Sequence, residues 1–234
     1  MADIAPGKVF FAPDQTSRSV WVVVDPKDLV TGARVTSALE VQLRDVNAAD
    51  DGDPIAAKPI AARSGVYCFT DLKLAATDYF VEVKPVSKDR DRYFDNKTKF
   101  TLVTIPVPAQ PLNRNAIAVE LLPKPSYPFD AKATLARGRL VKTSDANAPI
   151  PDAQIFLILD TVDQGRRGQT DQRGEYAVFF PPSPPVEDDP SADLKEFKFQ
   201  LRFEIPNQPP HLTAETTVKE GTTKSLNVIK FPGT

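Results

Sequence analysis

The side chains that could do catalytic chemistry are few in this sequence. It contains one histidine, His211, and one cysteine, Cys68, in 234 residues. A Ser-His-Asp triad would have to use His211, which lies in a proline-rich stretch that we expect to be an exposed loop. A zinc site with paired histidines is excluded, because the sequence contains a single histidine. We therefore predict no catalytic residues, no enzyme activity, no metal and no cofactor.

Cys68 lies between two aromatic residues, Tyr67 and Phe69, in a segment with the alternation of a strand. We predict that it is a small apolar residue of the core, because nothing in the sequence around it would activate a thiol. With a single cysteine, the chain can form neither an internal disulfide nor a cysteine-based metal site.

A short acidic run comprises Asp50, Asp51 and Asp53, followed directly by Pro54. Calcium loops place several carboxylates at fixed spacing over a longer stretch, so a solvated turn is the favoured interpretation. Calcium binding by these three carboxylates stays open as the alternative.

Four residues are candidates for contact with another protein. Tyr93 and Phe94 follow a run of alternating charges, which pair locally and do not make a basic groove. If exposed, the two rings would be good interface anchors; if buried, they would cap the edge of a sandwich. Arg166 and Arg167 are predicted at a hairpin tip, where they could meet an acidic partner or form a soluble turn.

Composition narrows the class of protein. Hydrophobic residues make up 41% and charged residues 26% of the chain, as in soluble globular proteins. The formal net charge of −2 argues against nucleic acid as a partner. The first residues lack the pattern of a secretory signal, and no apolar run approaches the ~20 residues of a membrane span. We expect cytoplasmic synthesis without a signal peptide, no membrane insertion, and a place in a larger particle as an open possibility.

Proline is the compositional outlier, and it marks the ends of short apolar segments. The 23 prolines are roughly twice the usual share, and helical periodicity is nearly absent. Many short alternating segments bounded by proline are typical of an all-β sandwich. Strands are predicted around residues 20–24, 39–45, 64–72, 79–85, 116–122, 135–141, 150–159, 174–179, 197–205 and 224–231.

The sequence Thr170-Asp171-Gln172-Arg173-Gly174 predicts a tight turn before an alternating strand. The Asp171 carboxylate can accept backbone N–H groups across the turn, and Gly174 can take the positive φ that the turn needs. Gly65 is also followed two residues later by a tyrosine, as Gly174 is. We therefore predict two copies of one sandwich, separated by about 110 residues, with the first copy the more divergent.

The segment from Pro149 to Ala153, the strand that follows it and the Asp171 turn together resemble the carboxypeptidase regulatory-like, transthyretin-like β-sandwich. This resemblance implies an accessory domain without peptidase activity. The expected fold is all-β, with two tandem Ig-like or prealbumin-type antiparallel sandwiches joined by a proline-rich linker. We place the divergent N-terminal sandwich with its extended first segment at 1–122, the linker at 123–130 and the regulatory-like sandwich at 131–234.

The segments 121–129 and 134–138 resemble proteins found alongside phage tail and contractile injection components. That resemblance implies a structural adaptor that docks onto other proteins, among them tail, baseplate or cap proteins. The alternative function is a carbohydrate- or ligand-binding sandwich, for which Tyr93, Phe94, Tyr127 and Phe129 are the candidate aromatic residues. The sequence leaves the oligomeric state open.

Overall fold

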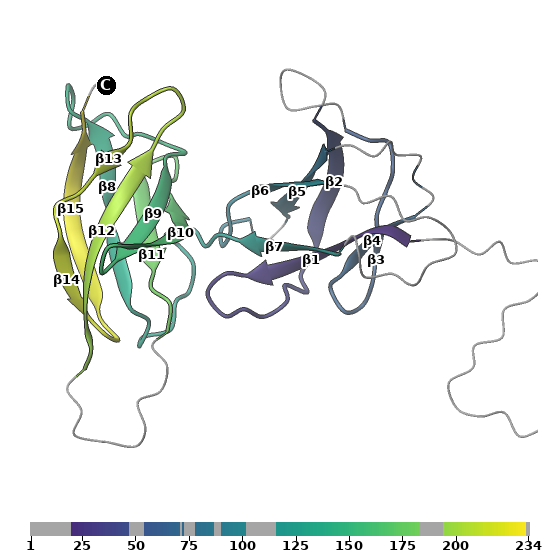
Figure 1. Cartoon of the computed structure of the whole chain (residues 1–234), viewed down its shortest axis with the longest axis horizontal. Helices are drawn as coiled ribbons and strands as arrows, with labels where there is room; N and C mark the ends of the chain where they lie inside the picture. Colours follow the sequence, from purple (N-terminus) through teal and green to yellow (C-terminus); the bar gives the residue numbers. More distant parts are fainter. Residues whose placement is uncertain are drawn as a thin grey trace, which may run out of the picture.

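The structure is a computed structural model that describes residues 20–46, 54–70, 72, 78–86, 90–101, 116–182 and 194–232. Within these ranges every regular element is a β-strand, and the strands form two lobes (Figure 1). Each lobe has its own hydrophobic core, drawn from residues 22–121 in the first and 136–231 in the second. The chain therefore folds as two tandem β-sandwiches, which confirms the predicted fold class.

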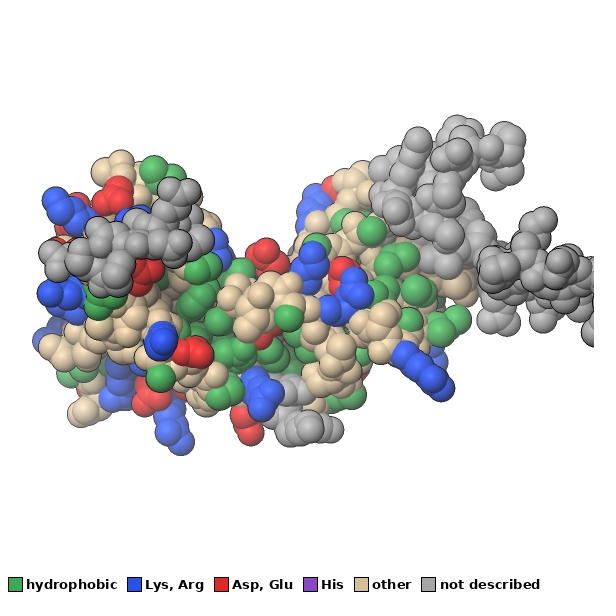
Figure 2. Space-filling view, turned by 90° about the horizontal axis from the view of Figure 1, so that it is seen from below, with side chains coloured by type: hydrophobic (Ala, Val, Ile, Leu, Met, Phe, Trp, Pro, Cys, Tyr) green, Lys and Arg blue, Asp and Glu red, His purple; other side chains and the backbone are tan. Residues whose placement is uncertain are grey.

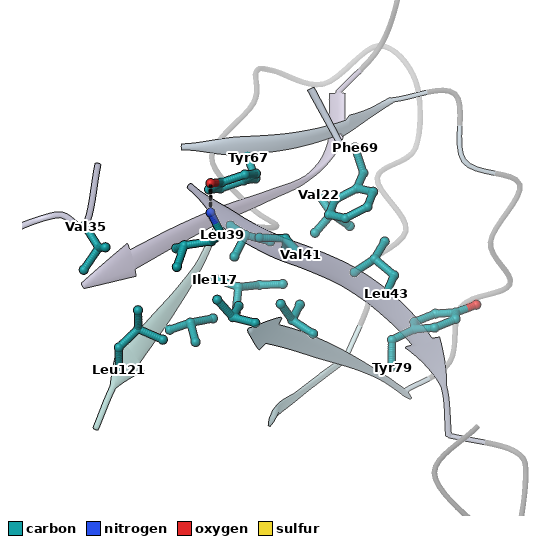
Figure 3. Packing of buried hydrophobic residues seen from close by; sticks show 14 of the residues in the cluster. Val22, Val35, Leu39, Val41, Leu43, Tyr67, Phe69, Tyr79, Ile117 and Leu121 are labelled. Carbon is teal, nitrogen blue, oxygen red and sulfur yellow. Dashed lines mark hydrogen bonds between the residues drawn. The ribbon is translucent and has the colours of Figure 1, made fainter. Parts of the chain in front are cut away.

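The first sandwich packs a four-stranded sheet, in the order β3-β4-β1-β7, against a three-stranded sheet, β2-β5-β6. Its strands are β1 (Val20–Asp28), β2 (Leu39–Asp45), β3 (Ile60–Ala61), β4 (Tyr67–Thr70), β5 (Asp78–Pro85), β6 (Asn96–Thr101) and β7 (Ala116–Leu121). Alternation aims every second residue inward, so Val22 and Phe69 of one sheet meet Val41 and Leu43 of the other (Figure 3). The Tyr67 hydroxyl accepts a hydrogen bond from the backbone N–H of Leu39 at 3.0 Å and so ties the two sheets together.

The second sandwich packs the sheet β10-β9-β12, in which β12 also pairs with β13 and β14, against the sheet β11-β8-β15. Its strands are β8 (Leu135–Lys142), β9 (Gln154–Leu159), β10 (Val162–Gln169), β11 (Glu175–Phe179), β12 (Glu196–Glu204), β13 (His211–Leu212), β14 (Thr216–Lys219) and β15 (Thr223–Phe231). Phe199, Leu201 and Phe203 of β12 project into the core, where Phe199 meets Phe180 edge-to-face with ring centroids 4.9 Å apart.

The two sandwiches share one topology, as the sequence repeat predicted. In each, the first strand pairs antiparallel with the glycine-led strand and parallel with the last strand, giving β4-β1-β7 and β11-β8-β15. The facing sheets correspond in the same way, as β2-β5-β6 and β9-β12-β14. Among the strands that the structure describes, the otherwise antiparallel architecture contains one parallel pair in each half.

Each sandwich has a turn glycine with a positive φ, shortly before the strand that pairs with its first strand. Gly65 and Gly174 have φ values of 82° and 71°, and a Cβ at Gly174 would overlap the carbonyl oxygen of Leu140. Asp171 Oδ1 accepts the backbone N–H groups of Arg173 at 2.8 Å and Glu175 at 2.9 Å. The predicted turn is confirmed, and it places β11 against β8.

Three predictions about local structure were wrong. Arg166 and Arg167 were expected at a hairpin tip, but the turn is formed by Asp160 and Thr161, and β10 follows them. Both arginines therefore lie within a strand; two bulges in β10 hide its alternation. Cys68 is half-buried, on the opposite face of β4 from the core, because its two aromatic neighbours take the inward positions. His211 was expected in an exposed loop, but it belongs to β13, and its ring packs against Phe231.

Substituting Gly174 by alanine should destabilise the second sandwich more than substituting Gly165. Both glycines have positive φ, which costs an alanine about 1–2 kcal/mol, but a Cβ at Gly165 meets nothing within 4 Å. The overlap with Leu140 should add about 2 kcal/mol or more to the Gly174→Ala penalty. Chemical denaturation of the two variants measures the difference, and equal losses would contradict the turn geometry.

Candidate functional site: the join between the sandwiches

The linker that joins the two sandwiches is docked along the first of them. The backbone N–H of Lys124 donates to Arg92 O at 2.7 Å, and the N–H of Phe94 donates to Leu122 O at 2.9 Å. Lys124 Nζ donates to Arg90 O at 2.7 Å. These bonds run from Leu122 and Lys124, on either side of the point where the linker begins, to the segment 90–94, so the start of the linker is held against the first sandwich.

A buried carboxylate lies at the centre of this contact. Asp28, at the end of β1, is only 5% exposed. It accepts hydrogen bonds from the hydroxyls of Tyr93 at 2.8 Å and Tyr127 at 2.5 Å, and from the backbone N–H of Val30 at 2.7 Å. A buried charge is tolerated when such donors replace the water it has lost. Asp28 therefore binds together β1, the segment 90–94 and the linker.

The two tyrosines remain protonated donors over the whole neutral range. Burial, and then the hydrogen bond to Asp28, raise the pKa of Tyr127 to about 12. The same two causes, in the same order, raise the pKa of Tyr93 well above its ordinary value. A phenolate beside the Asp28 carboxylate would place two negative charges together in a buried site, so the hydroxyl form is strongly favoured.

The second sandwich is fastened to the same linker through Arg137 of β8. Its guanidinium donates to Pro125 O at 3.2 Å and lies 5.3 Å from the centroid of the Phe129 ring. The Phe129 ring meets the Tyr127 ring edge-on, with centroids 4.8 Å apart, and the centroids of the Tyr127 and Tyr93 rings are 5.6 Å apart. A continuous stack thus runs from the first sandwich across the linker to β8. We call this stack, with Asp28 beneath it, the clamp.

Two hollows flank the clamp, and Figure 2 shows the surface dipping between the lobes. The larger is a cleft of about 810 Å³ whose lining carries charges of both signs from both sandwiches. Its lining includes Arg90, Asp91, Asp95, Lys124, Arg137, Asp152, Asp171, Arg173 and Glu175. A second cavity of about 310 Å³ lies between Arg166 of β10 and residues of the first sandwich.

Three of the four predicted interface residues gather at this join. Tyr93 and Phe94 are each 6% exposed, so the structure shows them capping the first sandwich and not standing free as anchors. Phe94 also borders the larger cleft, and Arg166 borders the smaller cavity. Arg167 lies apart from both hollows, with its Nε donating to Gln164 O within β10. The acidic run Asp50, Asp51 and Asp53 lies outside the described residues.

Asp28 and Arg137 carry no sequence signal for the roles that they have at the join. Asp28 follows an apolar strand and a proline, a pattern that indicates a solvated turn. Arg137 alternates with apolar residues, as any outward strand residue does. In the described ranges, no three His, Cys, Asp or Glu side chains are grouped so that they could hold a metal ion. The same ranges contain no helix with the length and apolar character of a membrane span.

No family model matches the chain, and a search of curated proteins finds no match. Among solved structures, the chain is similar to the Bacillus anthracis TIE protein at 10% identity and a TM-score of 0.29, covering 91% of this chain. The present chain spans only 34% of the length of that protein and 61% of the length of a streptococcal ancillary pilin, to which it is also similar. The shaft pilin spaA of Lactobacillus rhamnosus GG is similar at 10% identity and a TM-score of 0.28, with 90% and 97% coverage of the two chains. Similarity at this level does not assign a function.

The substitution Tyr127→Phe should lower the free energy of unfolding by about 1.5–3 kcal/mol, because it removes a hydrogen bond to a charged group. The matched control is Tyr176→Phe, because the buried Tyr176 hydroxyl has no hydrogen-bond partner in the described structure and its loss should be neutral or stabilising. Asp28→Ala should cost more than Tyr127→Phe, since it leaves two phenols without their acceptor. Urea unfolding curves compare the three variants, and equal effects at Tyr127 and Tyr176 would exclude the clamp.

Proposed function

We propose that this chain is a non-catalytic structural protein that acts as an adaptor and docks onto partner proteins. The observation that carries the proposal is the clamp, which fastens the linker to both sandwiches through Asp28 on one side and Arg137 on the other. A flexible linker would let the two halves reorient freely, whereas a docked linker fixes their spacing. Fixed spacing is what a protein needs if it is to hold two partners at a set distance.

Fixed geometry also has an energetic consequence for docking. A surface that is already ordered loses less conformational entropy when a partner binds. Two docking faces on one rigid body further raise the effective concentration of the second partner once the first is bound. The clamp therefore makes the two sandwiches one preorganised surface, which supports a role in assembly.

The assembly that we propose is a phage tail-like or contractile injection particle, with tail, baseplate or cap proteins as partners. The support is the resemblance of segments 121–129 and 134–138 to proteins found alongside such components. These segments contain Tyr127, Phe129 and Arg137, and so they contribute the part of the clamp that reaches the second sandwich. We also propose that the second sandwich belongs to the carboxypeptidase regulatory-like domains, on the strength of the Asp171 turn.

The geometry does not favour the carbohydrate-binding alternative. A sugar-binding sheet face needs exposed aromatic rings on which a sugar ring can stack. Tyr93 and Phe94 are buried, and Tyr127 and Phe129 are half-buried within the clamp. Tyr127 contacts the rings of both Tyr93 and Phe129, and Lys124 Nζ lies over the Phe94 ring, so these rings are engaged within the chain.

Particle incorporation tests the proposal. Extracts of the source cells are fractionated by density-gradient sedimentation, and the chain is detected in each fraction. We expect the wild-type chain to co-sediment with a particle far heavier than its own 25.7 kDa and to resist washing. Arg137→Ala should reduce incorporation several-fold, because it loosens the attachment of the second sandwich.

The matched control is Arg139→Ala on the same strand. The Arg139 guanidinium donates to Arg173 O at 3.0 Å and to Asn147 O at 3.5 Å, both within the second sandwich. Its loss should leave incorporation near wild type. A wild-type chain found only as a free monomer would overturn the structural role. Incorporation that is unaffected by Arg137→Ala would show that fixed spacing is not required for it.

A further inference from the structure

Arg166 projects from β10 at the boundary between the two sandwiches. Its side chain is half-buried and borders the cavity of about 310 Å³ beside the clamp. The two bulges of β10 lie on either side of it, and they re-aim its side chain relative to a regular strand. The other lining residues all belong to the first sandwich or its end: Leu29, Asn96, Thr98, Ala118, Glu120 and Leu122.

The hydrogen bonds of this guanidinium are incomplete. One terminal nitrogen donates to Gln169 Oε1, and Gln169 in turn donates to Asp152 Oδ1 at 3.0 Å. Arg166 Nε is fully buried and has no acceptor among the described residues. Burial lowers the pKa of the Arg166 guanidinium, although the group stays protonated at physiological pH. A half-buried cation without a carboxylate partner is costly, and an oxyanion beside the guanidinium best relieves that cost.

The opposite wall of the cavity decides which oxyanion fits. The Asn96 side-chain amide donates to the backbone oxygen of Glu120, so it is already engaged there. Thr98 adds a hydroxyl that can donate. Glu120 itself is exposed and forms no ion pair with Arg166 in the described structure. Its negative charge on the same wall disfavours a dianion such as phosphate more than a singly charged carboxylate.

We propose that this cavity binds one carboxylate, supplied by an Asp or Glu side chain of a partner protein inserted between the sandwiches, with the Arg166 guanidinium as its partner. Only the source of the carboxylate rests on the proposed adaptor function; the site itself rests on the cavity and the guanidinium. The volume is that of a small ligand site and admits an acidic side chain. Insertion at the boundary would bring the partner into contact with both sandwiches at once.

The experiment is a proton–nitrogen NMR titration that observes the arginine Nε–H signals of the full chain. The probes are sodium acetate, the blocked tripeptide acetyl-Gly-Glu-Gly-amide and inorganic phosphate. We expect the Arg166 signal to shift and saturate with acetate and peptide, and at higher concentration with phosphate. The Arg167 and Arg139 signals serve as internal controls, because their Nε atoms already donate to Gln164 O and Arg173 O.

Two variants sharpen the result. Glu120→Gln removes the like charge from an exposed position and should tighten peptide binding by about twofold to fivefold. Arg166→Lys keeps the charge but loses the planar guanidinium, and should weaken peptide binding by about tenfold or more, followed through the backbone amides. Because Glu120 is exposed, its variant tests the site even if Arg166→Lys does not fold.

Several outcomes would overturn the carboxylate site. They are an Arg166 signal that no probe moves, tighter binding of phosphate than of peptide, and a large shift of the signal in unliganded Glu120→Gln, which would make Glu120 the occupant. Carboxylate binding with normal particle incorporation of Arg166→Lys would overturn the partner as its source. Carboxylate binding by a chain that never joins a particle would leave the site standing while the adaptor function fails.

Discussion

The carboxylate of Asp28 is buried at the end of β1 and held by hydrogen bonds from neutral donors. Its two phenolic donors, Tyr93 and Tyr127, lie 65 and 99 residues further along the chain. A carboxylate that has lost its water must keep such donors, so the segment 90–94 and the linker cannot leave β1 without exposing or orphaning a charge. The end of the first sandwich is therefore the place where the linker becomes fixed.

The arrangement of the join follows from that constraint. Tyr127, once held by Asp28, presents its ring to Phe129, and Phe129 receives the guanidinium of Arg137 from the second sandwich. The charged cleft and the Arg166 cavity exist only because the two sandwiches are kept in this relation. Local chemistry at one buried carboxylate thus leads to a two-lobed body with preorganised surfaces, which is the basis for the adaptor function that we propose.

Much of the fold could be predicted from the sequence, because alternation and turn chemistry are local. The strand 39–45 matches β2 residue for residue, and the Asp171 turn forms the two backbone hydrogen bonds that its residue types allow. The polar strands β6 and β10 escaped prediction. The residues of β6 are mostly polar, and the bulges around Arg166 break the period of β10. Neither strand carries a clean alternation, and sheet pairing alone assigns them.

The candidate site was predicted only in part, for a different reason. Tyr93, Phe94 and Arg166 stand out by residue type, and all three do lie at the join. What they contact depends on residues distant in the sequence, and the aromatic pair caps the sandwich of its own chain. Asp28 carries no local signal, because its role exists only once Tyr93 and Tyr127 have been brought to it.

We infer that the clamp makes one rigid body of the two sandwiches. Nitrogen-15 relaxation measured on the full chain tests it directly, because the rotational correlation time of each sandwich can be obtained separately. A rigid join predicts that both sandwiches tumble with a single correlation time, appropriate to the whole chain of 25.7 kDa. Two different and shorter correlation times, as for domains on a free linker, would contradict the account.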